Sequence, residues 1–288
     1  MNCLRFLLSV AFLLATGLQC GAGTLAQFRT VFGDIEVELY DQDKPVTVQN
    51  FVRYVRSGSY SNEIAHRLVP GFVIQGGGFT ITNRGATNAQ IVAVPTFPNI
   101  TNEFGVGRRF SNVYGTIAMA KQAGDTNSAS SQWFFNLTNN AFLDANDTNY
   151  LFVVFGHVVR GTNVLNVFNS FVNWSGLVTP PRNTNLVLHQ YYLSPFDDLP
   201  LLQPNTYDSN FVYMDITLLE LAAKPLPGGG RQLTWNSPSG MTNYLEYATN
   251  LPPVWKTLVQ TNGTGTSISI LDSAVADRSR LYRVRVAY

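Results

Sequence analysis

The stretch "HRLVPGFVIQGGGF", from His66 to Phe79, combines one arginine and one glutamine with an otherwise apolar run that ends in glycines. A core strand has no use for the charge of Arg67, and a surface loop has no use for the apolar residues between Arg67 and Gln75. The pattern therefore indicates a site that needs a fixed cation and a fixed amide beside an apolar surface.

The sequence lacks the residue patterns of metal sites, of serine nucleophiles and of phosphate-binding loops. The three histidines, His66, His157 and His189, do not have the spacing of metal ligands. The segment "DANDTN" at 144–149 resembles the start of a calcium loop, but Phe155 stands where a bidentate glutamate is needed. The sequence contains neither a G-x-S-x-G elbow nor a phosphate-binding loop. We therefore expect an activity that needs no metal ion and no cofactor.

The elements that must position this site are mostly short strands. The segment 33–41, "GDIEVELYD", alternates between apolar and acidic residues and predicts a half-buried strand. Apolar residues at helical spacing predict one helix near 48–55, with Thr47 as its N-cap, and a second near 164–171. Many short strands with two helices favour a mainly β fold whose antiparallel sheet closes on itself, because a barrel leaves no unpaired edge.

The chain divides by composition. Residues 172–210 contain several prolines without sustained periodicity and predict a long loop insertion in a domain at 24–223. The segment 224–230, "KPLPGGG", has the composition of a linker. Beyond it, strand-like pieces predict a small C-terminal β-sandwich-like domain at 231–288.

The N-terminal segment, residues 1–23, has a basic Arg5, an apolar run and small residues around Cys20, which is the layout of a secretory signal peptide. The run is shorter than the about 20 residues that span a bilayer. We therefore expect an exported protein, periplasmic or extracellular, without an integral membrane span and cleaved near residues 20–24. Cleavage removes both cysteines, Cys3 and Cys20, which excludes disulfides from the mature chain, and lipidation of Cys20 stays open.

The charge balance narrows the class of partner. The formal net charge is +1, and charged residues make up 13% of the 288 residues, against about 25% in a typical soluble domain. This balance gives no reason to expect nucleic acid as a partner.

Several blocks of the sequence resemble the cyclophilin family of peptidyl-prolyl cis–trans isomerases, in the family's order. They are "GDIEVELYDQDKPVTVQNFVRYVRSGSY", "HRLVPGFVIQGGGF", "NEFGVGRRFSNVYGTIAMAKQAGDTNSASSQWFFNL" and "FLDANDTNYLFVVFGHVVRG", and the resemblance runs from Gln27 to Leu221. It implies a closed eight-stranded antiparallel β-barrel capped by two helices, with the active site on its outer face. It also implies that the chain accelerates rotation about X–Pro bonds in proline-containing peptides and unfolded protein chains.

The resemblance implies roles for particular residues. In the family, the counterpart of Arg67 is catalytic, that of Gln75 orients the arginine, and those of Phe72 and Phe134 line the proline pocket. The catalytic set is therefore Arg67, Phe72, Gln75 and Phe134. The substrate-binding set is His66, Val73, Ala120, Lys121, Gln132, Phe142, Leu143 and Phe152. The chain departs from the family's pattern at Gly78, where an aspartate is usual, and at Lys121, Phe142 and Phe152.

The chemistry accounts for these residue types. Amide resonance gives the X–Pro bond a rotation barrier of about 18–20 kcal/mol. In the twisted transition state the prolyl nitrogen carries a free lone pair, so a donor aimed at that nitrogen stabilises the twisted form in preference to the planar one. A guanidinium such as that of Arg67 stays protonated and presents several donors in a rigid fork.

Alternatives stay open for the residues and for the whole chain. Arg67 could pair with a carboxylate, the phenylalanines could be ordinary core, and His66 could be structural. The chain could be a non-catalytic proline-binding chaperone or scaffold. We expect a monomer, and the C-terminal domain could bind an unknown partner or stabilise the rest.

Overall fold

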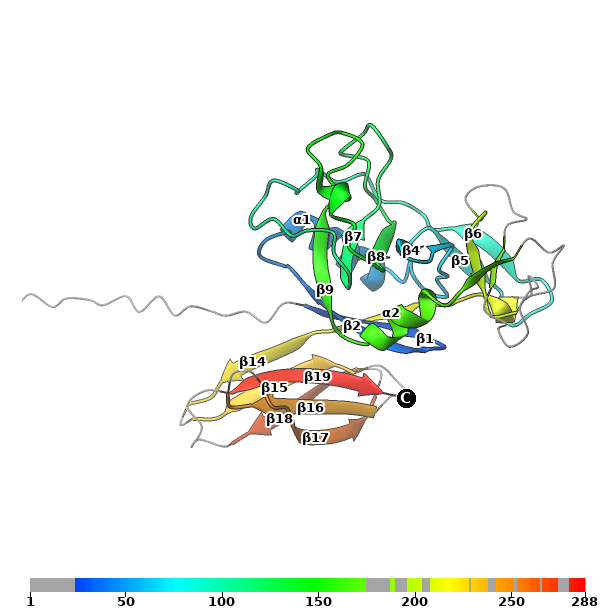
Figure 1. Ribbon diagram of the computed structural model, residues 1–288. Coiled ribbons are helices and arrows are strands. Elements are labelled where there is room, and N and C mark those ends of the chain that lie inside the picture. The colour runs from blue at the N-terminus through cyan, green and yellow to red at the C-terminus, as the bar shows by residue number, and fades with distance from the viewer. Residues whose placement is uncertain are drawn as a thin grey trace, which may run out of the picture.

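The computed structural model describes residues 24–174, 187–189, 196–203, 208–227, 229–237, 242–250, 253–264, 266–273 and 280–287 (Figure 1). The segment predicted as a signal peptide, residues 1–23, lies outside these described residues. Among the helices of the described ranges, none combines the length and the apolar character that crossing a bilayer requires.

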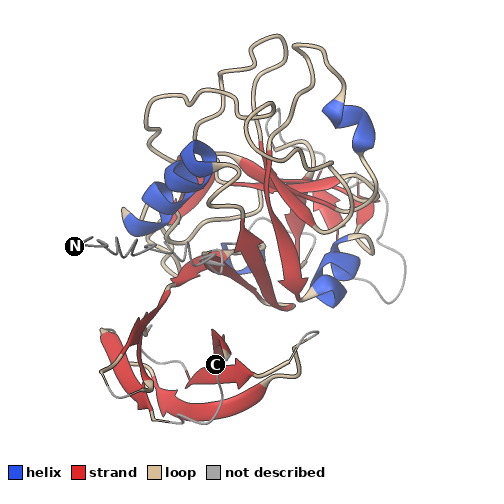
Figure 2. Ribbon diagram, turned by 90° about the vertical axis from the view of Figure 1, so that its left-hand side faces the viewer, coloured by secondary structure: helices blue, strands red, loops and turns tan. Residues whose placement is uncertain are grey.

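The largest element is an antiparallel sheet of eight strands that curls around a core (Figures 1 and 2). Its strands are β1 (Leu25–Thr30), β2 (Gly33–Leu39), β3 (Arg67–Val69), β4 (Val73–Gly76), β7 (Thr116–Met119), β8 (Trp133–Asn136), β9 (Val154–Arg160) and β13 (Asp215–Leu219). Their order across the sheet is β13-β1-β2-β9-β7-β8-β4-β3. The prediction of a mainly β fold with two helices is confirmed.

The sheet is open, so the prediction of a closed barrel is wrong. No ladder joins the edge strands β3 and β13 in the described chain, and one isolated bridge, from Ile64 to Tyr213, lies just before each of them. The backbone N–H of Leu68 in β3 donates instead to the carbonyl oxygen of Asp198, at 2.9 Å. A strand of three residues offers few groups for pairing, and the segment around Asp198 uses one that closure would require.

Two helices pack against the sheet: α1 (Pro45–Arg56) contacts β13, and α2 (Thr162–Phe168) contacts β2. Helix α1 begins before Thr47, so the predicted N-cap is wrong. The carboxylate of Glu103, a residue distant in the sequence, accepts hydrogen bonds from the backbone N–H groups of Val46 and Thr47, at 3.1 and 2.8 Å. It thereby satisfies the free donors of the first turn, as a capping side chain would.

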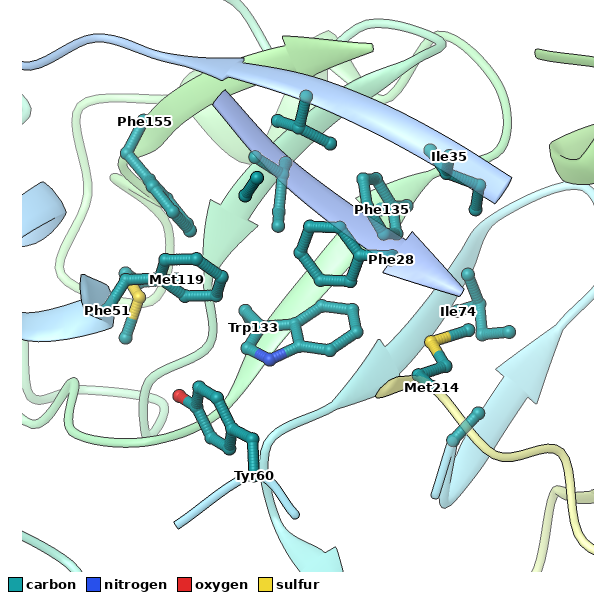
Figure 3. Packing of buried hydrophobic residues seen from close by; sticks show 14 of the residues in the cluster. Phe28, Ile35, Phe51, Tyr60, Ile74, Met119, Trp133, Phe135, Phe155 and Met214 are labelled. Carbon is teal, nitrogen blue, oxygen red and sulfur yellow. The ribbon is translucent and has the colours of Figure 1, made fainter. Parts of the chain in front are cut away.

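The inner face of the sheet and helix α1 enclose an aromatic core (Figure 3). Phe28 lies at its centre, with ring centroids 5.0 Å from both Trp133 and Phe135 and edge-to-face geometry at each contact. Such pairs add about 0.5–1.5 kcal/mol to the burial of their area. The strand predicted at 33–41 turns Ile35 and Val37 into this core, as its alternation indicates.

The segment predicted as a long loop, residues 172–210, contains strands where it is described. These are β10 (Val172–Trp174), β11 (Val187–His189) and β12 (Leu199–Leu201), which form a three-stranded sheet, followed by the 3-10 helix η2 (Asp208–Asn210). Leu199 and Leu201 are fully buried in a second apolar cluster, which also contains Ile81 of the hairpin β5–β6 (Phe79–Thr82 and Gln90–Ala93). We call the described residues 196–203 the docked segment.

Two further three-stranded sheets follow the main sheet, with orders β14-β15-β18 and β17-β16-β19 (Figure 1). Their strands are β14 (Leu221–Pro225), β15 (Arg231–Asn236), β16 (Thr242–Ala248), β17 (Lys256–Asn262), β18 (Ser267–Asp272) and β19 (Leu281–Ala287). Leu233, Trp235, Leu245 and Val284 from both sheets share one buried cluster. The segment predicted as a linker, 224–230, contains the end of β14 and the turn into β15.

Candidate active site

Four side chains of the predicted site region stand in one row across the main sheet. Arg67 on β3 is the register partner of Gln75 on β4, which pairs with Phe134 on β8, and Phe134 pairs with Ala118 on β7. Register partners in a sheet present their side chains on the same face. Their neighbours along the strands, Leu68, Ile74, Phe135 and Ile117, are all fully buried in the core. The row therefore lies on the outer face.

An apolar cluster surrounds the middle of this row. Its buried members are Val73, Ala118, Phe134, Leu143 and Val154, and its partly buried members are Tyr40, Phe72, Phe110, Ala120, Tyr150 and Phe152. The cluster brings together the predicted Phe72, Val73, Ala120, Phe134, Leu143 and Phe152. A second apolar surface on the far side of the sheet from the core is what a pocket for a proline ring requires.

Aromatic contacts shape the cluster. The ring of Phe152 meets Phe134 edge to face at 5.7 Å, and Phe72 stacks on Phe142 at 5.9 Å. Phe142 belongs to the 3-10 helix η1 (Ala141–Asp144) and is 56% exposed, so it forms the rim of the pocket and Leu143 lies inside. Sequence reasoning missed Tyr40 and Phe110, which stack at 3.8 Å at another side of the cluster.

Buried asparagines hold the loop of Phe72 in place. The carbonyl oxygen of Phe72 accepts hydrogen bonds from the backbone N–H of Leu137 at 2.8 Å and from the side-chain amide of Asn140 at 2.9 Å. Asn140 in turn donates to Asn136 at 2.8 Å, and both asparagines are buried. Satisfied buried amides of this kind fix one geometry, so the pocket wall is preorganised.

A pair of glutamines links β4 to the residue directly before β8. The side-chain amide of Gln75 donates to the side-chain oxygen of Gln132 at 2.6 Å. Among the side-chain hydrogen bonds of the described residues, none joins Gln75 to Arg67, although the two are register partners. Gln132 lies beside β8, and its carbonyl oxygen accepts the N–H of Ala120 at 2.9 Å, which links the predicted residues Gln75, Gln132 and Ala120.

Arg67 faces a carboxylate that the sequence did not reveal. Its Nε lies 3.7 Å from Oδ2 of Asp198, and the two side chains are 35% and 28% exposed. The alternative that Arg67 pairs with a carboxylate is therefore present in the structure. The distance is beyond a hydrogen bond, and such partly exposed pairs contribute about 0–1 kcal/mol to stability. The guanidinium thus remains partly open to solvent beside the pocket.

His66, predicted among the substrate-binding residues, is a buried side chain next to Arg67. The residue directly precedes β3 and is 2% exposed, whereas the side chain of Arg67 is 35% exposed. Its ring contacts Phe79 edge to face at 5.1 Å. Burial, with the charge of Arg67 as a further cause, lowers the pKa of His66 to about 4, while a hydrogen bond with Gln132 raises it. His66 is neutral at physiological pH.

The same packing explains one departure from the family's pattern. A Cβ atom on Gly78 would lie 2.9 Å from Cε1 of His66 and 3.2 Å from the amide of Gln132. These contacts leave little room for a side chain, so the aspartate usual in the family has no space unless its neighbours shift.

Lys121 lies at the outer rim. Its ammonium donates to the carbonyl oxygen of Thr148 at 2.9 Å and sits 4.8 Å from the centroid of the Phe152 ring. Burial lowers the pKa of Lys121 below its usual value. In the described part of the chain, no group of three or more histidine, cysteine, aspartate or glutamate side chains is arranged to hold a metal ion.

The burial of His66 predicts how stability depends on pH. The unfolded chain binds a proton at His66 near pH 6.5, and the folded chain binds it near pH 4. The free energy of unfolding should therefore fall by roughly 3 kcal/mol as the pH is lowered through this window, because protons favour the unfolded state. Urea unfolding of the wild type and of His66→Gln at pH 7 and pH 4 checks this. An identical loss in both proteins would contradict it.

Three comparisons with known proteins bear on this site. The family model described as "Cyclophilin type peptidyl-prolyl cis-trans isomerase/CLD" matches residues 25–187. The chain is 45% identical over 135 residues to peptidyl-prolyl cis-trans isomerase A of Dickeya dadantii, a match that covers 47% of this chain and 65% of that relative. It is 40% identical over 144 residues to a peptidyl-prolyl cis-trans isomerase of Acinetobacter baylyi, which covers 50% of this chain and 71% of the relative.

Among solved structures, the chain is similar to a cyclophilin-type peptidyl-prolyl cis-trans isomerase of Cryptosporidium parvum. The TM-score is 0.42 at 21% sequence identity, covering 68% of this chain and 96% of that chain. A second structure of the same protein, in the presence of the dipeptide Ala-Pro, gives a TM-score of 0.40 at 20% identity, covering 67% and 98%.

Proposed function

Because this chain belongs to the cyclophilin-type peptidyl-prolyl cis–trans isomerases, we propose that its outer pocket holds a proline ring while Arg67 accelerates rotation of the preceding peptide bond. The chain spans 65% of the length of its relative from Dickeya dadantii. The activity of the chain as a whole is therefore proposed and not transferred from that relative. The observation that carries it is the row Arg67–Gln75–Phe134 beside the apolar cluster.

The pocket supplies binding. Phe134 and Leu143 are nearly buried, at 4% and 6% exposure, and Phe72 and Phe152 lie around them. A pyrrolidine ring that enters replaces the remaining water over these side chains, which favours binding in proportion to the apolar area covered. Exclusion of water also strengthens the electrostatic interaction between a charged side chain and a substrate in the pocket.

The guanidinium of Arg67 accelerates the rotation. A planar X–Pro amide shares its nitrogen lone pair with the carbonyl, so it offers a guanidinium little to bind. The twisted amide has a localised lone pair, and the N–H groups of Arg67 stabilise it selectively. Each 1.36 kcal/mol of this preference gives about a tenfold faster rotation, so a 10⁵-fold acceleration needs about 7 kcal/mol. The step moves no proton to the protein and forms no covalent bond.

The catalytic assay on the wild type is the primary test. The chain without residues 1–23 should accelerate cis–trans isomerisation of a short Xaa-Pro peptide, and it should shorten the proline-limited phase of refolding of an unrelated protein. Spontaneous isomerisation takes tens to hundreds of seconds, so acceleration is measured easily. Proline-peptide binding without acceleration in either assay would favour the non-catalytic chaperone instead.

We propose that the clients are flexible or unfolded chains outside the cytoplasm. The support is the sequence pattern of residues 1–23 and the low charge content of 13%. Cell fractionation of the full chain and of a variant that lacks residues 1–23 tests this, with export expected for the full chain alone. Recovery of the full chain in the cytoplasm would overturn it.

We propose that the C-terminal sheets form a separate domain. The cluster of Leu233, Trp235, Leu245 and Val284 gives these sheets a common core, which also includes Leu219 of β13, and supports a boundary at about residue 221 rather than 231. We propose that this unit, as a partner-binding module or a stabilising appendage, is not needed for the chemistry.

A further inference from the structure

The docked segment brings one carboxylate to the cation of the pocket. Asp198 Oδ2 approaches the guanidinium of Arg67 at Nε, at 3.7 Å. Within the described residues, neither Arg67 nor Asp198 forms another ion pair. The approach is at Nε, and in the described part of the chain no ion pair or hydrogen bond engages the terminal nitrogens of Arg67, so they stay available to the pocket.

The backbone fixes Asp198 in this position. Phe196 and Leu199 close a turn, with the N–H of Leu199 donating to the carbonyl oxygen of Phe196 at 3.3 Å. The next residues, Leu199 and Leu201, are fully buried in the second apolar cluster. The carbonyl oxygen of Asp198 itself accepts the N–H of Leu68, the residue that follows Arg67, at 2.9 Å. The carboxylate is therefore anchored directly beside the strand of Arg67.

The amide that the family resemblance assigns to the orientation of Arg67 makes its hydrogen bond with another side chain, and none of the side-chain hydrogen bonds of the described residues joins it to Arg67. Gln75 donates to Gln132 at 2.6 Å, on the side of the row away from β3. An arginine side chain has several rotatable bonds, and a partly exposed one samples many rotamers unless a neighbour restricts them. Among the described residues, Asp198 is the side chain that forms an ion pair with Arg67.

We propose that Asp198 is a positioning residue for Arg67, supplied by the docked segment and acting through the Nε edge of the guanidinium. This inference rests on the proposed function. The carboxylate also offsets part of the charge of Arg67, but at 3.7 Å and with partial exposure this field is screened. Orientation is the larger effect, since a misplacement of about 1 Å costs up to 10²-fold in rate.

The electrostatics of Asp198 agree with this assignment. Burial raises the pKa of Asp198, the charge of Arg67 lowers it, and the neighbouring Asp197 raises it again. A carboxylate in this position is thus costly to ionise, and the cation it faces offsets part of that cost.

The experiment compares Asp198→Asn with Asp197→Asn, which removes the same charge one residue away. Asp198→Asn keeps the shape and the backbone anchor. We expect it to lower kcat for an Xaa-Pro peptide by about threefold to tenfold with KM nearly unchanged, because Arg67 acts on the twisted bond. Asp197→Asn should match the wild type, and Asp198→Glu should recover part of the loss.

A spectroscopic measurement is independent of activity. The ¹⁵Nε–H resonance of Arg67, identified by its loss in Arg67→Lys, should shift in Asp198→Asn and stay in place in Asp197→Asn. A wild type that is active, with equal kcat in both asparagine variants or a higher kcat in Asp198→Asn, overturns this inference and leaves the proposed function intact. A wild type without activity overturns the proposed function and this inference with it.

Discussion

Replacing Arg67 by alanine lowers kcat/KM for an Xaa-Pro peptide by about 10²- to 10³-fold. The expected size is that of removing one preorganised donor from a transition state. The apolar cluster around Phe134 is untouched by this change, so the peptide should still bind with an affinity close to that of the wild type. The measurement is the isomerisation rate under saturating and limiting peptide, together with a binding titration of the same peptide.

Two further variants sharpen this result. Arg67→Lys keeps the charge but replaces the rigid fork with a single ammonium and removes Nε, so it should recover a small part of the rate. Arg84→Ala removes a different arginine, which stacks on Tyr213 at 3.6 Å, and should leave the rate unchanged. Full activity of Arg67→Ala would refute the assignment of this cation.

Replacing Gly77 by alanine destabilises the fold by about 2–5 kcal/mol. Gly77 has a φ of +77°, which costs an alanine about 1–2 kcal/mol. A Cβ atom there would also overlap the carbonyl oxygen of Ser131 and lie 3.0 Å from both Gln132 Cα and Trp133 Cδ1. Backbone atoms cannot move aside as a flexible side chain can, so overpacking adds about 1–3 kcal/mol. Urea unfolding measures the change.

Gly85 provides the matched control. Its φ of +81° is nearly the same, but a Cβ atom there would meet no atom within 4 Å. Gly85→Ala should therefore show the backbone cost alone, about 1–2 kcal/mol. The difference between the two variants isolates the steric overlap at the end of β4, next to Gln75 of the site. Equal losses would show that the close approach of Ser131 relaxes without cost.

Local patterns in the sequence were sufficient for much of the fold. The alternation in 33–41 predicts which side chains of β2 face the core, and the helical spacing near 48–55 predicts the buried face of α1. The outer pocket could be anticipated through resemblance, because its residues lie in blocks with a distinctive order. Their joint placement on one face follows from register, which single strands do not reveal.

Features that depend on distant pairings were missed. The cap of α1 comes from Glu103, far along the chain, so the local signal at Thr47 was misleading. The partner of Arg67 comes from a proline-rich stretch without periodicity, where "SPFDDLP" gave no indication that Asp198 would reach β3. The same docking occupies an edge that a closed barrel would pair, and no property of β3 alone predicts that.

The connection between the main sheet and the C-terminal sheets is short. Strand β13 ends at Leu219 and β14 begins at Leu221, so Glu220 alone separates them, and its carboxylate is bound by Arg56 of α1 and by Asn236 of β15 at 3.2 Å. The connection is therefore a single residue held by two side chains, and not a flexible linker. Leu219 of β13 also packs in the buried cluster of the C-terminal sheets, so this connection is supported by packing as well as by the contacts of Glu220.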